Sequence, residues 1–64
     1  MSDDKIAQLN DRIAILRDNI RQLTEQAAAL SGAADESRAA DRIAQQTEEL
    51  QRLVKERDEV AARS

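Results

Sequence analysis

The amino-acid sequence predicts an all-α fold: a two-helix antiparallel coiled-coil hairpin that assembles into a four-helix bundle. The first reason is composition, because the 64 residues include no aromatic residue, Cys, His or Pro and only one Gly. Ala, Leu, Gln and charged residues dominate instead, and they favour helix over sheet. The second reason is that apolar residues recur at alternating spacings of three and four, the period of a coiled coil. The third is that the glycine divides the chain into two segments of similar length.

The first segment is predicted to be helical over about residues 3–30. Its apolar positions form a heptad pattern with mainly Ile in one series and Leu in the other, which places one stripe against a partner helix. Ser2 suits an N-cap, and the acidic Asp3 and Asp4 favour the positive end of the helix dipole. The predicted stripe comprises Ile6, Leu9, Ile13, Leu16, Ile20, Leu23, Ala27 and Leu30.

A turn is predicted over about residues 31–36, where Ser31, Gly32, Asp35 and Ser37 cluster. Gly32 follows the last periodic residue, so it is expected to end the first helix in the left-handed conformation. Asp35 or Ser37 would then cap the second helix. The alternative is one continuous helix in a parallel dimer, in which a mid-helix glycine costs about 1 kcal/mol. The first segment suits such a dimer, but the small residues of the second segment support it poorly.

The second helix is predicted over about residues 37–62. One series recurs every seven residues with small side chains, and a second series is larger. Arg57 falls in the second series, and we expect its stem to cover the end of the core while its guanidinium reaches solvent or acidic neighbours. A register-fixing buried cation is the alternative for Arg57, and a partner-selecting polar layer is the alternative for Gln46 and Thr47. The predicted seam residues are Ala40, Ile43, Thr47, Leu50, Val54 and Arg57.

Two registers of the hairpin match the stripes. In the favoured one, the numbers of facing residues add up to 63, and a large side chain often faces a smaller one, which lets the layers interdigitate. The other register adds up to 70 and requires a connection that reaches Ser37. The favoured register pairs Leu23 with Ala40, Ile20 with Ile43, Leu16 with Thr47, Ile13 with Leu50, Leu9 with Val54 and Ile6 with Arg57.

Association of hairpins is expected because two helices cover only one stripe of each other. The chain has thirteen Ile, Leu and Val residues, and a lone helix pair leaves them partly exposed to water. The apolar residues outside the predicted seam form a candidate oligomer face of Ile15, Ala39, Leu53 and Val60. Ala7, Ala14 and Ala28 lie on the other flank, where small side chains permit close approach. We therefore predict a homo-oligomer, a dimer of hairpins.

The sequence indicates no catalytic, cofactor-binding or metal-binding residues. It lacks the His and Cys residues that most such sites use, and its Ser residues have no evident base. The net charge of −3 argues against nucleic-acid binding, and the apolar runs are too short for a membrane span. The chain opens without a signal-peptide pattern, so a cytoplasmic location is expected. The predicted function is a non-catalytic structural or adaptor protein. The alternative is a small regulator that lays an amphipathic face on an unknown larger protein.

Overall fold

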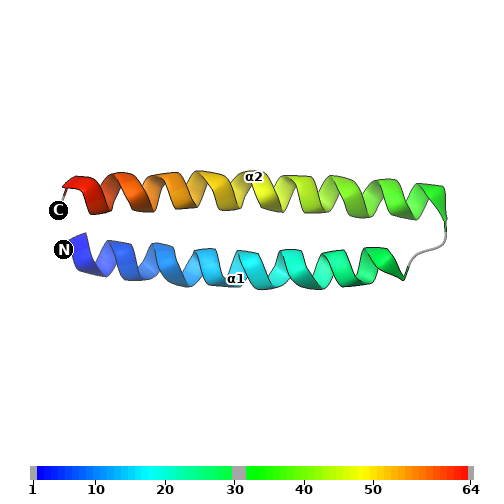
Figure 1. Ribbon diagram of the computed structural model, residues 1–64, viewed down its shortest axis with the longest axis horizontal. Helices are drawn as coiled ribbons and strands as arrows, with labels where there is room; N and C mark the ends of the chain where they lie inside the picture. The colour runs from blue at the N-terminus through cyan, green and yellow to red at the C-terminus, as the bar shows by residue number, and fades with distance from the viewer. Residues whose placement is uncertain (1, 30–31, 64) are drawn as a thin grey trace.

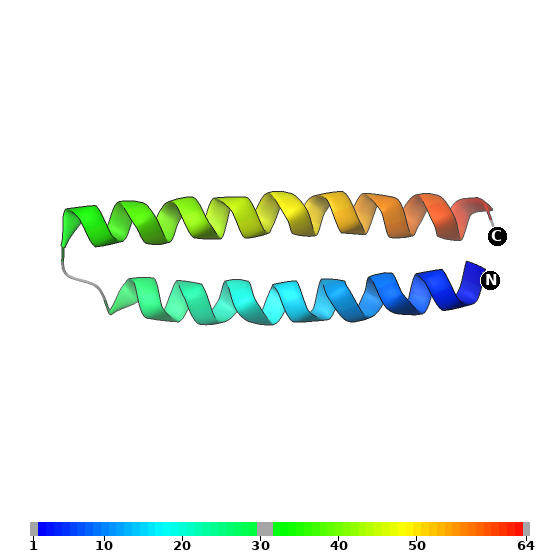
Figure 2. The same ribbon diagram turned by 180° about the vertical axis from the view of Figure 1, so that it is seen from behind.

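Two antiparallel helices make up the fold (Figure 1). The computed structural model describes residues 2–29 and 32–63, with α1 spanning Ser2–Ala28 and α2 spanning Ala33–Arg63. The pair is 48 Å long, and the view from behind shows the same side-by-side arrangement, with both termini at one end (Figure 2). The predicted all-α hairpin is therefore confirmed, and the continuous helix is excluded. Assembly into a four-helix bundle stays a prediction.

The helices form where local sequence supports them. Both begin with acidic residues in the first turn, Asp3 and Asp4 in α1 and Asp35 and Glu36 in α2, which the positive helix end favours. Thr47, a poor helix former, satisfies its hydroxyl within its own helix by donating to the Ile43 carbonyl at 2.7 Å. The chain thus needs no tertiary partner for this polar group.

The connection is shorter than the sequence suggests, and Gly32 plays a different part in it. The Glu36 amide donates to the Gly32 carbonyl at 2.9 Å, so Gly32 is the N-cap of α2. The predicted left-handed conformation is wrong, because the φ angle of Gly32 is not positive. Asp35 and Ser37 lie inside α2, which begins at Ala33 and not near residue 37. Ser31 and Leu30, the other predicted turn and stripe residues here, lie outside the described residues.

The core lies in the half of the hairpin nearest the termini. Leu9, Ile13 and Leu53 form one buried cluster, and Ile13 is only 2% exposed. The stripe of α1 faces α2, with every described member buried or half-buried: Ile6, Leu9, Ile13, Leu16, Ile20, Leu23 and Ala27. Partly buried aliphatic residues from both helices surround the cluster: Leu16, Leu50, Val54 and Val60.

The seam on α2 is rotated relative to the sequence-based expectation. Ala40 is exposed, whereas Leu53 is only 6% exposed and Val60 packs against the core. The physical reason is side-chain size: Leu53 and Val60 are larger than their neighbours Val54 and Ala61, so this rotation buries more apolar surface. The residues that face α1 are therefore Ala39, Ile43, Gln46, Leu50, Leu53, Arg57 and Val60. Thr47 and Val54 remain half-buried at the edge of the seam.

The register is close to the shorter of the two alternatives. The Lys5 ammonium lies 3.6 Å from the Glu56 carboxylate, and Leu9 shares the buried cluster with Leu53. The numbers of these pairs add up to 61 and 62, and those of Arg57 and Asn10, which share a hydrogen bond between the helices, add up to 67. The contacts therefore fall on both sides of 63 and all below 70. The longer register needs a connection that reaches Ser37, and the start of α2 at Ala33 leaves no room for it.

Candidate functional site

Two polar contacts between the helices mark two different sides of the hairpin. The Lys5–Glu56 ion pair closes one side. On the other side, Nη1 of Arg57 donates to Oδ1 of Asn10 at 3.1 Å. Lys5 and Asn10 flank the α1 stripe on opposite edges, since five residues correspond to about 140° around a helix. We call these the polar side, beside Lys5 and Glu56, and the apolar side, beside Asn10 and Arg57.

The polar side carries hydrogen-bonding and charged groups along its length. Helical spacing places Ile15 there as an isolated apolar side chain, 60% exposed, between Arg12 and Asn19. The remaining α1 residues of this row are Lys5, Gln8, Arg12, Asn19, Gln22 and Gln26. A lone exposed aliphatic residue is ordinary on a protein surface and marks no interface.

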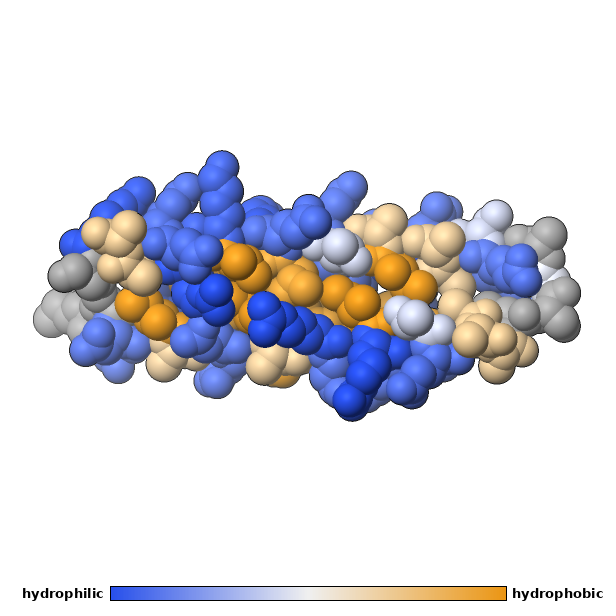
Figure 3. Space-filling view, in the orientation of Figure 1, coloured by the Kyte–Doolittle hydropathy of each residue, from blue (hydrophilic) through white to orange (hydrophobic). Residues whose placement is uncertain are grey.

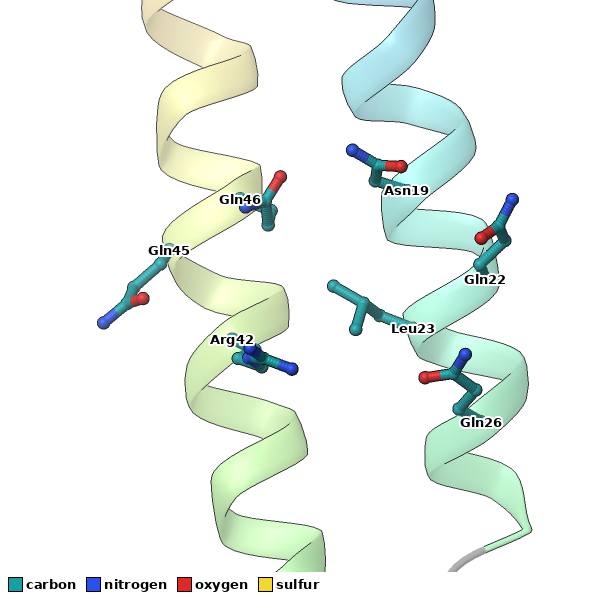
Figure 4. Close-up of a pocket in the computed structure, with 7 residues that line it drawn as sticks. All are labelled: Asn19, Gln22, Leu23, Gln26, Arg42, Gln45 and Gln46. Carbon is teal, nitrogen blue, oxygen red and sulfur yellow. The ribbon is translucent and has the colours of Figure 1, made fainter.

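A polar pocket lies on this side in the half of the hairpin nearer the turn (Figure 4). Asn19, Leu23 and Gln46 point into the space between the helices, whereas Gln45 points away. The Gln46 side-chain oxygen is buried and has no hydrogen-bond partner among the described residues. The complete lining is Asn19, Gln22, Leu23, Gln26, Arg42, Gln45 and Gln46. These side chains offer neither a nucleophile nor a carboxylate, so the pocket is not equipped for acid–base chemistry.

The apolar side has an open groove along α2. Leu50 and Val54 pack against the core cluster on one flank and remain half-exposed on the other. Ala62 extends the apolar lining, and the rim is completed by Gln51, Lys55, Asp58 and Glu59. In Figure 3 a hydrophobic band runs lengthwise between the two helices and reaches the surface. On the α1 edge of this side, Ala7, Ala14 and Ala28 lie on one row with a seven-residue repeat, in which Arg21 takes the remaining place, and all three alanines are exposed.

The four residues predicted as an oligomer face do not share one outer surface. Leu53 is in the core and Val60 packs against it, whereas Ile15 is exposed on the polar side. Ala39 is half-buried beside Leu23 at the turn end of the seam. The apolar surface that remains open is instead the Leu50–Val54 groove. Sequence reasoning missed this groove because Leu50 and Val54 both fit the predicted seam. The signal that the seam could rotate was the neighbouring series that contains Leu53 and Val60.

Comparison with known proteins gives no further assignment: no family model, curated protein or solved structure matches the chain. The fold and the open groove define the class, an antiparallel α-helical hairpin with one apolar side. Among the described residues, neither helix has the length and apolar character to cross a membrane. Within the same residues, no group of His, Cys, Asp and Glu is arranged to hold a metal ion.

Proposed function

We propose that this chain is a non-catalytic structural or adaptor protein whose hairpins self-associate through the apolar side into a four-helix bundle. The observation that carries the proposal is the amount of surface that the lone hairpin exposes, 4957 Å². A compact monomer of the same mass, 7.1 kDa, exposes about 4100 Å². The excess of about 850 Å² is close to the share of about 800 Å² that each partner buries in a stable interface.

The apolar side is the surface best suited to supply that area. Leu50 and Val54 already have one flank packed against the core, so a docking partner needs to cover only the other flank. Ala7 and Ala14 present small side chains on the facing helix, which lets a second helix come close. Docking through the polar side would instead remove Arg12, Gln22 and similar groups from water, which costs free energy when these groups are left unpaired.

The test is the mass in solution of three variants. We expect light scattering to give about twice the chain mass for the wild type, in keeping with a two-fold dimer. Val54→Lys should reduce the mass to one chain, because it places a charge in the groove. Ala62→Lys makes the same change at an exposed groove residue that the hairpin core does not need, so it separates dissociation from unfolding.

The matched control is Ile15→Lys, which adds the same charge on the polar side. We expect it to keep the wild-type mass. A wild-type chain that has the mass of one copy and melts cooperatively would overturn the proposal. If Ile15→Lys dissociated the dimer and Val54→Lys left it intact, the interface would lie on the polar side, which would contradict the proposal.

A further inference from the structure

We infer that the polar pocket in the turn half of the hairpin binds a small organic anion, a carboxylate or phosphate that also carries hydroxyl groups. This inference goes beyond self-association, because the pocket lies on the polar side and the proposed contact between copies lies on the apolar side. Two groups that line the same pocket carry it: a buried oxygen without a hydrogen-bond partner and a cation without an ion-pair partner among the described residues.

The buried oxygen is Oε1 of Gln46, and it has no hydrogen-bond partner among the described residues. Asn19 points into the same space from α1 (Figure 4), but its amide does not donate to this oxygen. Buried acceptors in proteins are almost always paired, and leaving one unpaired costs free energy. A ligand with an O–H group in the pocket would supply the donor that Gln46 lacks.

The cation is Arg42, which reaches from α2 toward α1 in Figure 4. No carboxylate lines this pocket, and Arg42 forms no ion pair within the described part of the chain. Arg38 and Asp35 line the adjacent hollow toward the turn, and their opposite charges leave the charge of Arg42 uncancelled. A guanidinium presents parallel N–H donors that match the oxygens of a carboxylate or a phosphate. The pocket therefore favours an anion.

The pocket also sets the size and polarity of the ligand. Arg42 and Gln46 lie one helical turn apart, about 6 Å along α2, so a short chain of carbon atoms can join the anion to the hydroxyl group. The pocket volume of about 350 Å³ is at the lower end of the range of about 300–1,000 Å³ for small-molecule sites. Apart from Leu23 and Arg42, every lining side chain is a carboxamide, which both donates and accepts hydrogen bonds. A small, hydroxylated ligand fits this lining better than an aromatic or aliphatic one.

The position of Gln46 in the hairpin supports a binding role. Gln46 lies in the seam of α2 between Ile43 and Leu50, where an aliphatic side chain would bury more apolar surface. Residues that oppose the packing of a fold in this way are expected at functional sites, where stability is lost in favour of binding. The polar pocket and the unpaired oxygen coincide at this residue.

Titrations followed by the side-chain amide signals in NMR spectra test the inference, because most residues that line the pocket are Asn or Gln. The probes are glycerate and glycerol 3-phosphate, which join hydroxyl groups to a carboxylate and to a phosphate. We expect saturable shifts of the pocket amide signals, and the tighter of the two probes identifies the preferred anion. Glycerol lacks the anion and acetate lacks the hydroxyl groups, so each should bind at least about fivefold more weakly.

Substitutions of the two groups provide the second test. Arg42→Gln should raise the dissociation constant of the tighter probe by about tenfold, because it removes the charge-assisted hydrogen bonds. Gln46→Leu should raise it by about fivefold while the hairpin stays folded, since Leu suits a seam position. Arg12→Gln removes the same charge at an exposed residue outside the pocket, and Gln45→Leu changes a side chain that points away from it (Figure 4). Both controls should leave the constant unchanged.

Three results would overturn the inference. The first is the absence of a saturable shift with either probe. The second is binding of acetate as tight as that of glycerate, which would reduce the site to general pairing of anions with arginine. The third is binding that Arg42→Gln or Gln46→Leu leaves intact. None of these results depends on the mass in solution, so the inference and the proposed self-association fail separately.

Discussion

Arg57 reaches from α2 across the hairpin and donates from Nη1 to Oδ1 of Asn10 at 3.1 Å. Its Nε and Nη2 both donate to Oδ1 of the neighbouring Asp58, each at 3.2 Å. The Arg57 side chain is 28% exposed, so its stem is largely covered while its guanidinium is held by polar groups. A cation thus occupies a seam position that the coiled-coil pattern reserves for apolar residues, without leaving a charge buried and unpaired.

We predict that Arg57 stabilises the open end of the hairpin mainly through its stem. Arg57→Ala should lower the free energy of unfolding by about 1 kcal/mol, because it removes both the packing and the exposed hydrogen bonds. Arg57→Met keeps the length of the stem and should cost clearly less. Urea unfolding followed by circular dichroism measures both, with exposed Arg52→Ala as the control. An Arg57→Met variant as unstable as Arg57→Ala would show that the hydrogen bonds dominate.

The sequence determines the packing of α1 more fully than that of α2. In α1, the apolar residues follow a single heptad stripe, and Ile15 is the only large aliphatic residue outside it. In α2, two stripes overlap: one contains Thr47 and Val54, the other Gln46 and Leu53, and both share Ile43 and Leu50. Periodicity alone does not choose between them. The choice depends on how much surface each rotation buries against α1, which requires the three-dimensional contacts.

Leu53 should therefore matter more to stability than its position in the predicted pattern suggests. Leu53→Ala removes a side chain that is 6% exposed, and large-to-small core changes of this kind cost about 2–5 kcal/mol. In so small a protein this loss should abolish most helicity at room temperature. Ile15→Ala removes an aliphatic side chain that is 60% exposed and should change the free energy of unfolding by less than about 0.5 kcal/mol. Equal effects of the two substitutions would contradict the observed rotation of α2.

We predict that the Gln46 side chain of the wild-type protein lowers the free energy of unfolding. Its side-chain oxygen is buried at the seam without a partner among the described residues, and such a group costs about 1–3 kcal/mol. Gln46→Leu should therefore raise the urea midpoint, by an amount equivalent to about 1 kcal/mol or more. Gln45→Leu is the matched control, because Gln45 points away from α1 (Figure 4), and it should leave the midpoint nearly unchanged. An equal gain from both would indicate a general hydrophobic effect with no contribution from the buried oxygen.

The candidate surface was less predictable than the fold, for the same reason. Composition and the single glycine are enough to predict two helices and a bend, and the structure has both. Which side of the hairpin stays open depends on which stripe of α2 faces α1. The predicted seam left Leu53 outside and turned Val54 inward, so it did not show that one flank of Val54 is exposed. The turn shows the same limit at a smaller scale. Gly32 marks the break, but its conformation depends on whether it ends α1 or begins α2, and glycine suits either position.

A substitution of Gly32 tests whether this residue ends α1 or begins α2. As the N-cap of α2, with a φ angle that is not positive, it can be replaced by Ser without backbone strain. A Cβ added there would meet its nearest neighbour, Oδ2 of Asp35, at 3.6 Å, an ordinary van der Waals contact. Ser is also a better N-cap than Gly and restricts the unfolded chain, so Gly32→Ser should stabilise the hairpin by a few tenths of a kcal/mol or more. A left-handed glycine at the end of α1 would instead make the same substitution destabilising by about 1 kcal/mol. Thermal unfolding followed by circular dichroism at one protein concentration decides between the two signs, because the concentration of an associating chain also shifts its midpoint. A lower midpoint for Gly32→Ser would show that Gly32 does not act as the N-cap of α2.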